Sequence, residues 1–236
     1  MSTCKAPEAG PTCLARLSQS QSTGIFERFN GWLFLALAAA ALTLAYRLGS
    51  LPLINPDEGR NAEIAREMKE RGEWLIPTYN GVTRLDKPAF YFKTVAFSLA
   101  AFGDNELAAR IPSFLFGAAI LMLVWAWCRR ETTPRVAALA VLVMATTPLF
   151  VSQARTVILD IALAWFVGLA IIAGYSAEQL TGQRRRGMYL LSWLATGMAT
   201  LVKGPVGLVV PMLVLLLFHG VEKRWEACKR LLSPMN

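Results

Sequence analysis

Six largely apolar runs constrain the fold of this chain more than any other feature of the sequence. With their flanking residues, most of them approach the roughly 17 to 25 residues that a helix needs to cross a bilayer. The last two are short and fit a tight hairpin that is broken at Lys203-Gly204-Pro205. The runs cover residues 32–46, 111–127, 136–151, 161–177, 188–202 and 206–218.

The composition agrees with a membrane protein. Hydrophobic residues make up 55% of the chain and charged residues only 17%, a balance that soluble domains of this length seldom reach. The sequence therefore predicts an all-α fold, a polytopic membrane helical bundle of about six transmembrane helices. It divides into a cytoplasmic N-terminal segment, residues 1–28, and a transmembrane domain, residues 29–236.

Basic residues gather between the apolar runs, and their positions predict the orientation. Because Lys and Arg are enriched in cytoplasmic loops, these clusters and the N-terminus are expected in the cytoplasm, and residues 47–110 form the first periplasmic loop. A surface for nucleic acid would not be divided by hydrophobic helices, so the net charge of +8 does not indicate nucleic-acid binding. The clusters are Arg129, Arg130 and Arg135, then Arg184, Arg185 and Arg186, then Lys223, Arg224, Lys229 and Arg230.

Residues 90–102 form a further apolar segment within this loop, which is interrupted by Lys93. If the segment crossed the bilayer, every later basic cluster would lie on the outer side. We therefore expect a helix that lies in or dips into the outer membrane interface.

The first part of the loop predicts a helix with an informative carboxylate. The run Asn55-Pro56-Asp57-Glu58 is typical of a capped helix start, and Gly72 is the expected stop. A helical period places Asp57 on the apolar face with Ile64, and Glu67 on the opposite face. Asp57 alone would be explained as a complement to the helix dipole. Its placement on the apolar face favours a functional or paired carboxylate.

Other ionisable residues lie in turns on the same predicted side of the membrane. The segment Arg84-Leu85-Asp86-Lys87-Pro88 precedes the interfacial helix, and taken alone it is an interfacial charged turn. Snorkelling would likewise explain single cations. Together these charges are better suited to an anionic lipid-linked substrate. The converging residues are Asp57, Arg60, Lys87, Arg155, Asp160 and Lys203.

Several ordered motifs resemble one known family, the bacterial aminoarabinose transferase and protein mannosyltransferase family, whose members are integral-membrane glycosyltransferases of the GT-C fold. The similarity runs from about residue 47 to the end of the chain. The motifs are Pro56-Asp57-Glu58-Gly59-Arg60, Gly72-Glu73-Trp74-Leu75-Ile76-Pro77, Asn80-Gly81, Asp86-Lys87-Pro88, Glu106-Leu107-Ala108-Ala109-Arg110 and Lys203-Gly204-Pro205.

The resemblance implies transfer of a sugar from a polyprenyl-phosphate carrier to lipid A or a protein at the periplasmic face of the bacterial inner membrane. It implies that Asp57 is the catalytic carboxylate and that Asp160 is a second acidic position. No cofactor is required. Arg60, Lys87 and Lys203 would bind the donor phosphate, with supporting positions at Glu58, Asp86 and Arg155.

The chain departs from the family pattern in three respects. Asp86 replaces the usual glutamate of Glu-Lys-Pro, which leaves a divalent metal at this position open, and Asn61 replaces a usual aromatic residue. Family members are about twice as long, so the family's C-terminal half is absent from this sequence. A separately encoded C-terminal half is therefore a candidate partner, besides the lipid-linked sugar, the acceptor and membrane lipid.

The residue inventory fits the implied chemistry. A carrier phosphate leaves as an anion that needs neutralisation rather than protonation, a role for Arg60, Lys87 and Lys203. Asp57 would act as general base for a hydroxyl acceptor and would only position a phosphate acceptor. One alternative is a lipid or sugar transporter without chemistry, but its charges should lie near the bilayer midplane. The other is a non-catalytic fragment or subunit.

Overall fold

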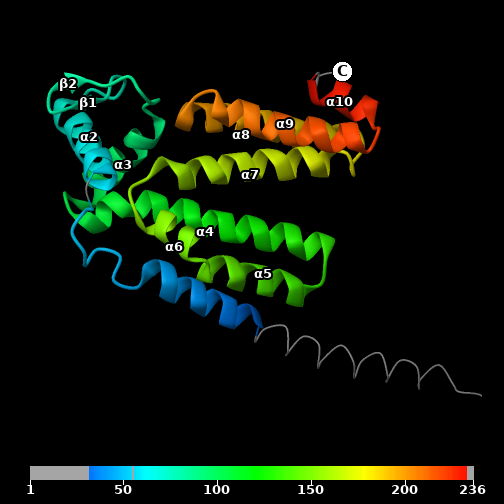
Figure 1. The fold of residues 1–236 in the computed structure, drawn as a ribbon, viewed down its shortest axis with the longest axis horizontal. Coiled ribbons are helices and arrows are strands. Elements are labelled where there is room, and N and C mark those ends of the chain that lie inside the picture. Colours follow the sequence, from blue (N-terminus) through cyan, green and yellow to red (C-terminus); the bar gives the residue numbers. More distant parts are fainter. Residues whose placement is uncertain (1–31, 55, 233–236) are drawn as a thin grey trace, which may run out of the picture.

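The computed structural model describes residues 32–54 and 56–232, and it is almost entirely helical, which confirms the predicted fold class. Long helices pack side by side, and the short helices and strands within residues 57–102 gather at one end of this bundle (Figure 1). The elements are an N-terminal helix Trp32–Ala45, α2 (Asp57–Arg71), β1 (Thr78–Tyr79), β2 (Val82–Thr83), α3 (Phe90–Phe102), α4 (Glu106–Glu131), α5 (Pro134–Thr146), α6 (Pro148–Arg155), α7 (Leu159–Ala177), α8 (Gly182–Lys203), α9 (Val206–Val221) and α10 (Trp225–Leu232).

Within the described residues, α4 and α7 are each long and apolar enough to cross a membrane. The pair α5 and α6 passes the same test together but bends by 67°. Helices occupy the other predicted runs, but the N-terminal helix and α9 are shorter apolar helices, and α8 begins in an arginine-rich turn. The helical bundle is confirmed, whereas the number of six spans stays a prediction.

The predicted run 136–151 is not one continuous helix, which corrects the sequence analysis. α5 ends at Thr146, and Thr147 takes an extended backbone with φ −69° and ψ 119° before Pro148 begins α6. Proline has no amide hydrogen to donate, and it disfavours helical backbone in the residue before it. The two halves therefore separate at this point.

Helix ends lie close to where the sequence predicts them. Gly72 ends α2 in a left-handed conformation with φ 67°, as expected of a glycine at this position. α3 has the predicted bounds 90–102, and the break at Gly204 separates α8 from α9. Asn55, the expected cap of α2, lies outside the described residues. The interfacial location of α3 stays a prediction.

One hydrophobic cluster joins the short helices to the end of the bundle. Ile64 of α2, Tyr91 of α3 and Ala108 of α4 are buried in the same cluster as Leu159 of α7 and Val202 of α8. Leu159 precedes Asp160, and Val202 precedes Lys203. The cluster therefore places the start of α7 and the end of α8 at the same end of the bundle as the helix that carries Asp57.

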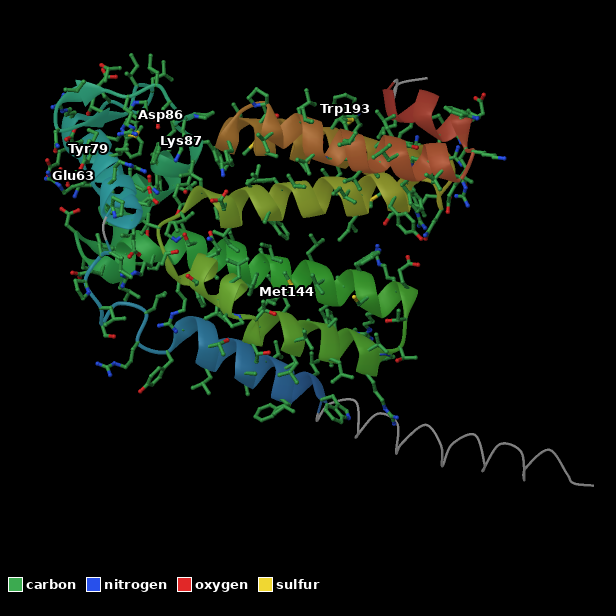
Figure 2. The ribbon with its side chains drawn as sticks, viewed as in Figure 1. Glu63, Tyr79, Asp86, Lys87, Met144 and Trp193 are labelled. Atoms are coloured by element: carbon green, nitrogen blue, oxygen red, sulfur yellow. The ribbon has the colours of Figure 1, made fainter. Side chains whose placement is uncertain are left out.

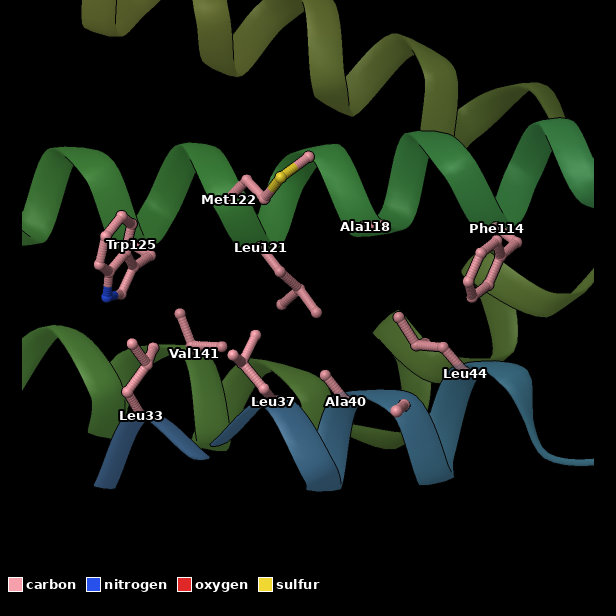
Figure 3. Close-up of a pocket in the computed structure, with 11 residues that line it drawn as sticks. Leu33, Leu37, Ala40, Leu44, Phe114, Ala118, Leu121, Met122, Trp125 and Val141 are labelled. Carbon is pink, nitrogen blue, oxygen red and sulfur yellow. The ribbon is translucent and has the colours of Figure 1, made fainter. Parts of the chain in front are cut away.

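A separate groove of about 410 Å³ runs between the N-terminal helix and α4 (Figure 3). Leu37 and Leu44 line it from one side, and Leu121 and Met122 from the other. None of the described residues that line the groove is ionisable. The groove therefore offers no charged group to a reaction.

Gly207 allows α9 to approach α8 closely. A Cβ atom at Gly207 would lie 2.2 Å from the carbonyl carbon of Ala199, whereas a Cβ atom at Gly197 would meet nothing within 4 Å. We predict that Gly207→Ala lowers the free energy of unfolding by about 1–3 kcal/mol. Thermal unfolding in one detergent measures the effect. Gly197→Ala is the matched control, and equal effects of the two substitutions would contradict the close packing.

Candidate functional site

Asp57 is exposed at the start of α2, and the prediction that it lies on the apolar face is wrong. Its side chain is 64% exposed and forms an ion pair with Arg60, one turn further along the helix. The buried face instead includes Glu58 and Asn61 beside Ile64. The helical period grouped Asn61 and Ile64 with Asp57, and these two are buried, but it could not indicate that Glu58 is buried through long-range hydrogen bonds.

Glu58 and Arg110 form a buried ion pair in which each group has all its partners. The Arg110 guanidinium donates to both Glu58 carboxylate oxygens, at 2.7 and 3.1 Å, and to the carbonyl oxygens of Leu48, Leu51 and Pro52. These bonds use all five of its N–H groups. Both side chains are 3% exposed. The pair fixes the start of α2 to α4 and to the segment after the N-terminal helix.

Two bonds connect α2 to the turn before α7. The amide of Val157 donates to Glu58 over 3.2 Å, and the Asn61 side chain donates to the Val157 carbonyl oxygen over 2.8 Å. Asp160 follows in the first turn of α7 and forms an ion pair with Lys203 at the end of α8. The sequence predicts Asp160 and Lys203 on the same side of the membrane, and in the structure the two side chains are in direct contact.

Glu67 joins α2 to the β-hairpin, and its predicted place on an outward face is wrong. The hydroxyl of Thr78 donates to Glu67 over 2.5 Å, and the amide of Gly81 donates over 3.3 Å. Burial alone would raise the pKa of the Glu67 carboxyl, but these hydrogen bonds hold that pKa below its ordinary value. The carboxylate therefore stays charged as the anchor of the hairpin.

The hairpin leads into the segment that carries Asp86 and Lys87, which Figure 2 shows at the same end of the molecule as α2. Arg84 donates two hydrogen bonds to Asp86, of 3.0 and 3.1 Å, and holds the pKa of the Asp86 carboxyl below its ordinary value. Lys87 is half-buried and contacts no hydrogen-bond or ion-pair partner within residues 32–54 and 56–232. Its ammonium group is therefore available to a ligand.

The part of the chain that the structure describes contains no group of three or more metal-ligating side chains. Asp86, where a metal was left open, is already bonded to Arg84. A metal at Asp86 would have to compete with this guanidinium.

Arg155 does not join the other predicted site residues. It donates to the carbonyl oxygens of Thr43 and Tyr46, over 2.6 and 2.8 Å, at the end of the N-terminal helix. Carbonyls at a helix C-terminus lack helical partners. Arg155 was predicted to support the site. In this structure it bonds to backbone carbonyl oxygens and not to a site carboxylate.

Sequence reasoning did not single out Arg110 or Asn61 as parts of the framework. Arg110 marked the end of the charged loop and of one family motif, and it lies inside a long apolar helix, where an arginine needs a partner. That position is the signal that identifies it. Asn61 gave no such signal, because its partner is a backbone carbonyl 96 residues further along the chain.

The assembled site combines two carboxylate–cation pairs with one available lysine. Asp57 with Arg60 and Asp160 with Lys203 are all partly exposed at one end of the bundle. Charge-assisted donors of this kind suit a phosphate group. The exposed carboxylates can accept hydrogen bonds or a proton from a bound hydroxyl.

Comparison with known proteins identifies relatives. The model of the dolichyl-phosphate-mannose-protein mannosyltransferase family matches residues 86–232. An undecaprenyl phosphate-alpha-4-amino-4-deoxy-L-arabinose arabinosyl transferase of Edwardsiella ictaluri is 31% identical over 85% of this chain and 37% of the relative. An enzyme of the same name from Pseudomonas aeruginosa is 31% identical over 81% of this chain and 35% of its own length.

Solved structures give the same result. The crystal structure of ArnT from Cupriavidus metallidurans bound to undecaprenyl phosphate matches with a TM-score of 0.80 and 31% identity, over 86% of this chain and 38% of that one. Its apo structure matches with a TM-score of 0.73 and 29% identity, over 89% and 38% of the two chains. The chain therefore spans little more than a third of the length of these relatives.

The buried ion pair yields a stability prediction. Glu58→Gln leaves the Arg110 charge buried without its counter-ion, so we expect a loss of about 3–5 kcal/mol in the free energy of unfolding. Glu63→Gln removes an exposed ion pair with Arg66 and should cost no more than about 1 kcal/mol. Unfolding of both variants in one detergent compares them. A Glu58→Gln variant as stable as the Glu63→Gln control would contradict the framework role.

Proposed function

Because the chain belongs to the dolichyl-phosphate-mannose-protein mannosyltransferase family of GT-C membrane glycosyltransferases, we propose that it supplies the donor-phosphate and carboxylate part of such a transferase. The donor is a sugar linked to a polyprenyl phosphate. The observation that carries the proposal is that two carboxylate–cation pairs and an available lysine lie at one end of the bundle.

Each residue has a proposed role. Lys87, Arg60 and Lys203 stabilise the carrier phosphate as negative charge develops on it. Asp57 faces the acceptor, because its side chain is the most exposed carboxylate of the two pairs, at 64%. Asp160 orients the sugar or the Lys203 ammonium. Glu58, Asp86 and Arg155 support the site indirectly through the contacts that each makes with a neighbouring segment.

The proposed reaction is a single displacement. The acceptor oxygen forms a bond to the anomeric carbon of the sugar, and the bond from that carbon to the carrier phosphate breaks. Its electron pair leaves with the phosphate, which the three cations neutralise. The proton of a hydroxyl acceptor goes to Asp57, whereas a phosphate acceptor carries no proton that must be removed and Asp57 only positions it.

The relatives suggest a specific donor. Their name specifies undecaprenyl phosphate-alpha-4-amino-4-deoxy-L-arabinose, and we extend this donor to the present chain. The acceptor is lipid A or a protein. As an inner-membrane protein with several spanning helices, the chain would have its N-terminus in the cytoplasm and its charged end in the periplasm.

One alternative is supported by a specific observation. The chain spans 37% of the Edwardsiella relative, so it would serve as a non-catalytic fragment or subunit if the remaining part of such enzymes is needed for transfer. A separately produced C-terminal part is then the partner. Transport without chemistry is less favoured, since the charged pairs lie at one end of the bundle.

Donor binding tests the cation role without requiring catalysis. We predict that Lys87→Gln weakens binding of undecaprenyl phosphate to the full chain by roughly tenfold, because it removes a charge-assisted donor to the phosphate. Native mass spectrometry in detergent measures the bound lipid. Lys223→Gln changes the net charge equally, away from the charged end, and should bind as the parent does. Equal binding by all three proteins would remove Lys87 from the site.

Transfer tests the role of Asp57. The assay measures sugar transfer by the chain alone and together with the C-terminal two-thirds of a relative. A general base contributes roughly 10²- to 10⁴-fold, so Asp57→Asn should lower transfer by at least about 100-fold in whichever arrangement is active. A variant within about threefold of the parent would exclude this role. Donor binding without transfer in either arrangement would favour the non-catalytic alternative.

A further inference from the structure

A cavity of about 500 Å³ lies where the segment after the N-terminal helix meets α4 and α6. Its volume is within the range of roughly 300–1,000 Å³ that is common for small-molecule sites. Three arginines line it, Arg47, Arg110 and Arg155, and none of its described lining residues is acidic. A cavity of this composition attracts an anion.

Two of the three positive charges are not compensated. Glu58 neutralises Arg110, and all five N–H groups of that guanidinium are used. Arg155 uses two N–H groups on the carbonyls of the N-terminal helix, which leaves three without a partner among the described residues. The Arg47 side chain makes no hydrogen bond or ion pair within that same part of the chain. The cavity therefore carries two charges that an anion would satisfy.

The turn that carries Arg47 is held in an unfavourable backbone conformation. Arg47 has φ 51°, a left-handed value that costs a residue with a side chain about 1–2 kcal/mol. Arg155 binds the carbonyl oxygen of Tyr46, and Arg110 binds that of Leu48, so the turn is fixed on both sides of Arg47. Strained residues that neighbours hold in place are common at ligand clamps.

The remaining lining has the character expected for a lipid headgroup. Leu51, Ile54 and Val151 supply apolar walls, and Ser152 supplies a hydroxyl. The cavity adjoins the end of an apolar helix and the bend between α5 and α6. A bare inorganic anion would gain nothing from the apolar walls, whereas an amphiphile places its phosphate on the arginines and its glycerol and first methylenes against the leucine and isoleucine.

The cavity is distinct from the carboxylate pairs. Ser152 and Arg155 of α6 face it, whereas Gln153 of the same helix lines another groove together with Asp160. α6 therefore has this cavity on one side and the Asp160 groove on the other. We infer that the Arg47–Arg155 cavity binds the phosphate of an anionic membrane lipid headgroup at a second site, separate from the proposed donor phosphate. This inference does not depend on the proposed transferase activity.

Lipid binding to the full 236-residue chain tests the inference. The chain is placed in nanodiscs of phosphatidylcholine with a minor fraction of phosphatidylglycerol, and native mass spectrometry counts each lipid that remains bound. Phosphatidylglycerol should be retained about tenfold more than phosphatidylcholine. Arg47→Gln should abolish this preference, because Arg47 is the cation with no other partner. Thermal unfolding verifies that the variant is folded, which is expected because the Arg47 side chain makes no hydrogen bond or ion pair within the described residues.

Arg135→Gln is the matched control. It removes one exposed arginine at the start of α5, so it changes the net charge equally without touching the cavity. Retention of the preference in this control supports the inference, and equal loss in both variants overturns it, because general charge would then explain the effect. A wild-type chain without preference between the two lipids also overturns it. Displacement of phosphatidylglycerol by millimolar inorganic phosphate would show an anion site without lipid specificity and would overturn the lipid assignment.

Discussion

The buried ion pair between Glu58 and Arg110 determines how the charged end of the protein is built. It joins three segments directly, the residues after the N-terminal helix, α2 and α4, and Glu58 adds a fourth through the amide of Val157. Removing two charges from water is costly, but here every donor of Arg110 and both oxygens of Glu58 are bonded. A fully satisfied network of this kind can be retained in a protein interior, whereas a half-satisfied one cannot.

This framework explains why the exposed carboxylates have defined positions. Asp57 directly precedes Glu58, and Asp160 lies three residues after Val157, so each is close in sequence to a residue of the network. Lys203 is held by its ion pair with Asp160. The buried charges of Glu58 and Arg110 therefore fix the backbone, while the neighbouring carboxylates of Asp57 and Asp160 stay exposed to a ligand. Lys87 is different, since it depends on the hairpin that Glu67 anchors.

The sequence predicted where helices form and end. It predicted much less well which side chains of a helix are buried and which charged side chains pair with one another. Runs of apolar residues and breaks at Gly72 and Gly204 are local signals, and the helices end there. The bend also had a local signal, Pro148 itself, which the prediction of one continuous apolar run over residues 136–151 did not use. The predictions that Asp57 lies on the apolar face of α2 and that Glu67 lies on its outward face were wrong. Partners elsewhere in the chain decide which polar side chains are buried. The contact between Asp160 and Lys203 agreed with topology, since both lie in turns on one side.

The bend between α5 and α6 links these observations. If residues 136–151 formed a straight span, α6 would continue along the bundle axis. The 67° bend instead turns α6 away from the direction of α5. There Arg155 reaches the last carbonyls of the N-terminal helix, while Gln153 lies beside Asp160 in the neighbouring groove. α6, which begins at the proline that interrupts this apolar run, therefore forms the wall between the Arg47–Arg155 cavity and the groove beside Asp160.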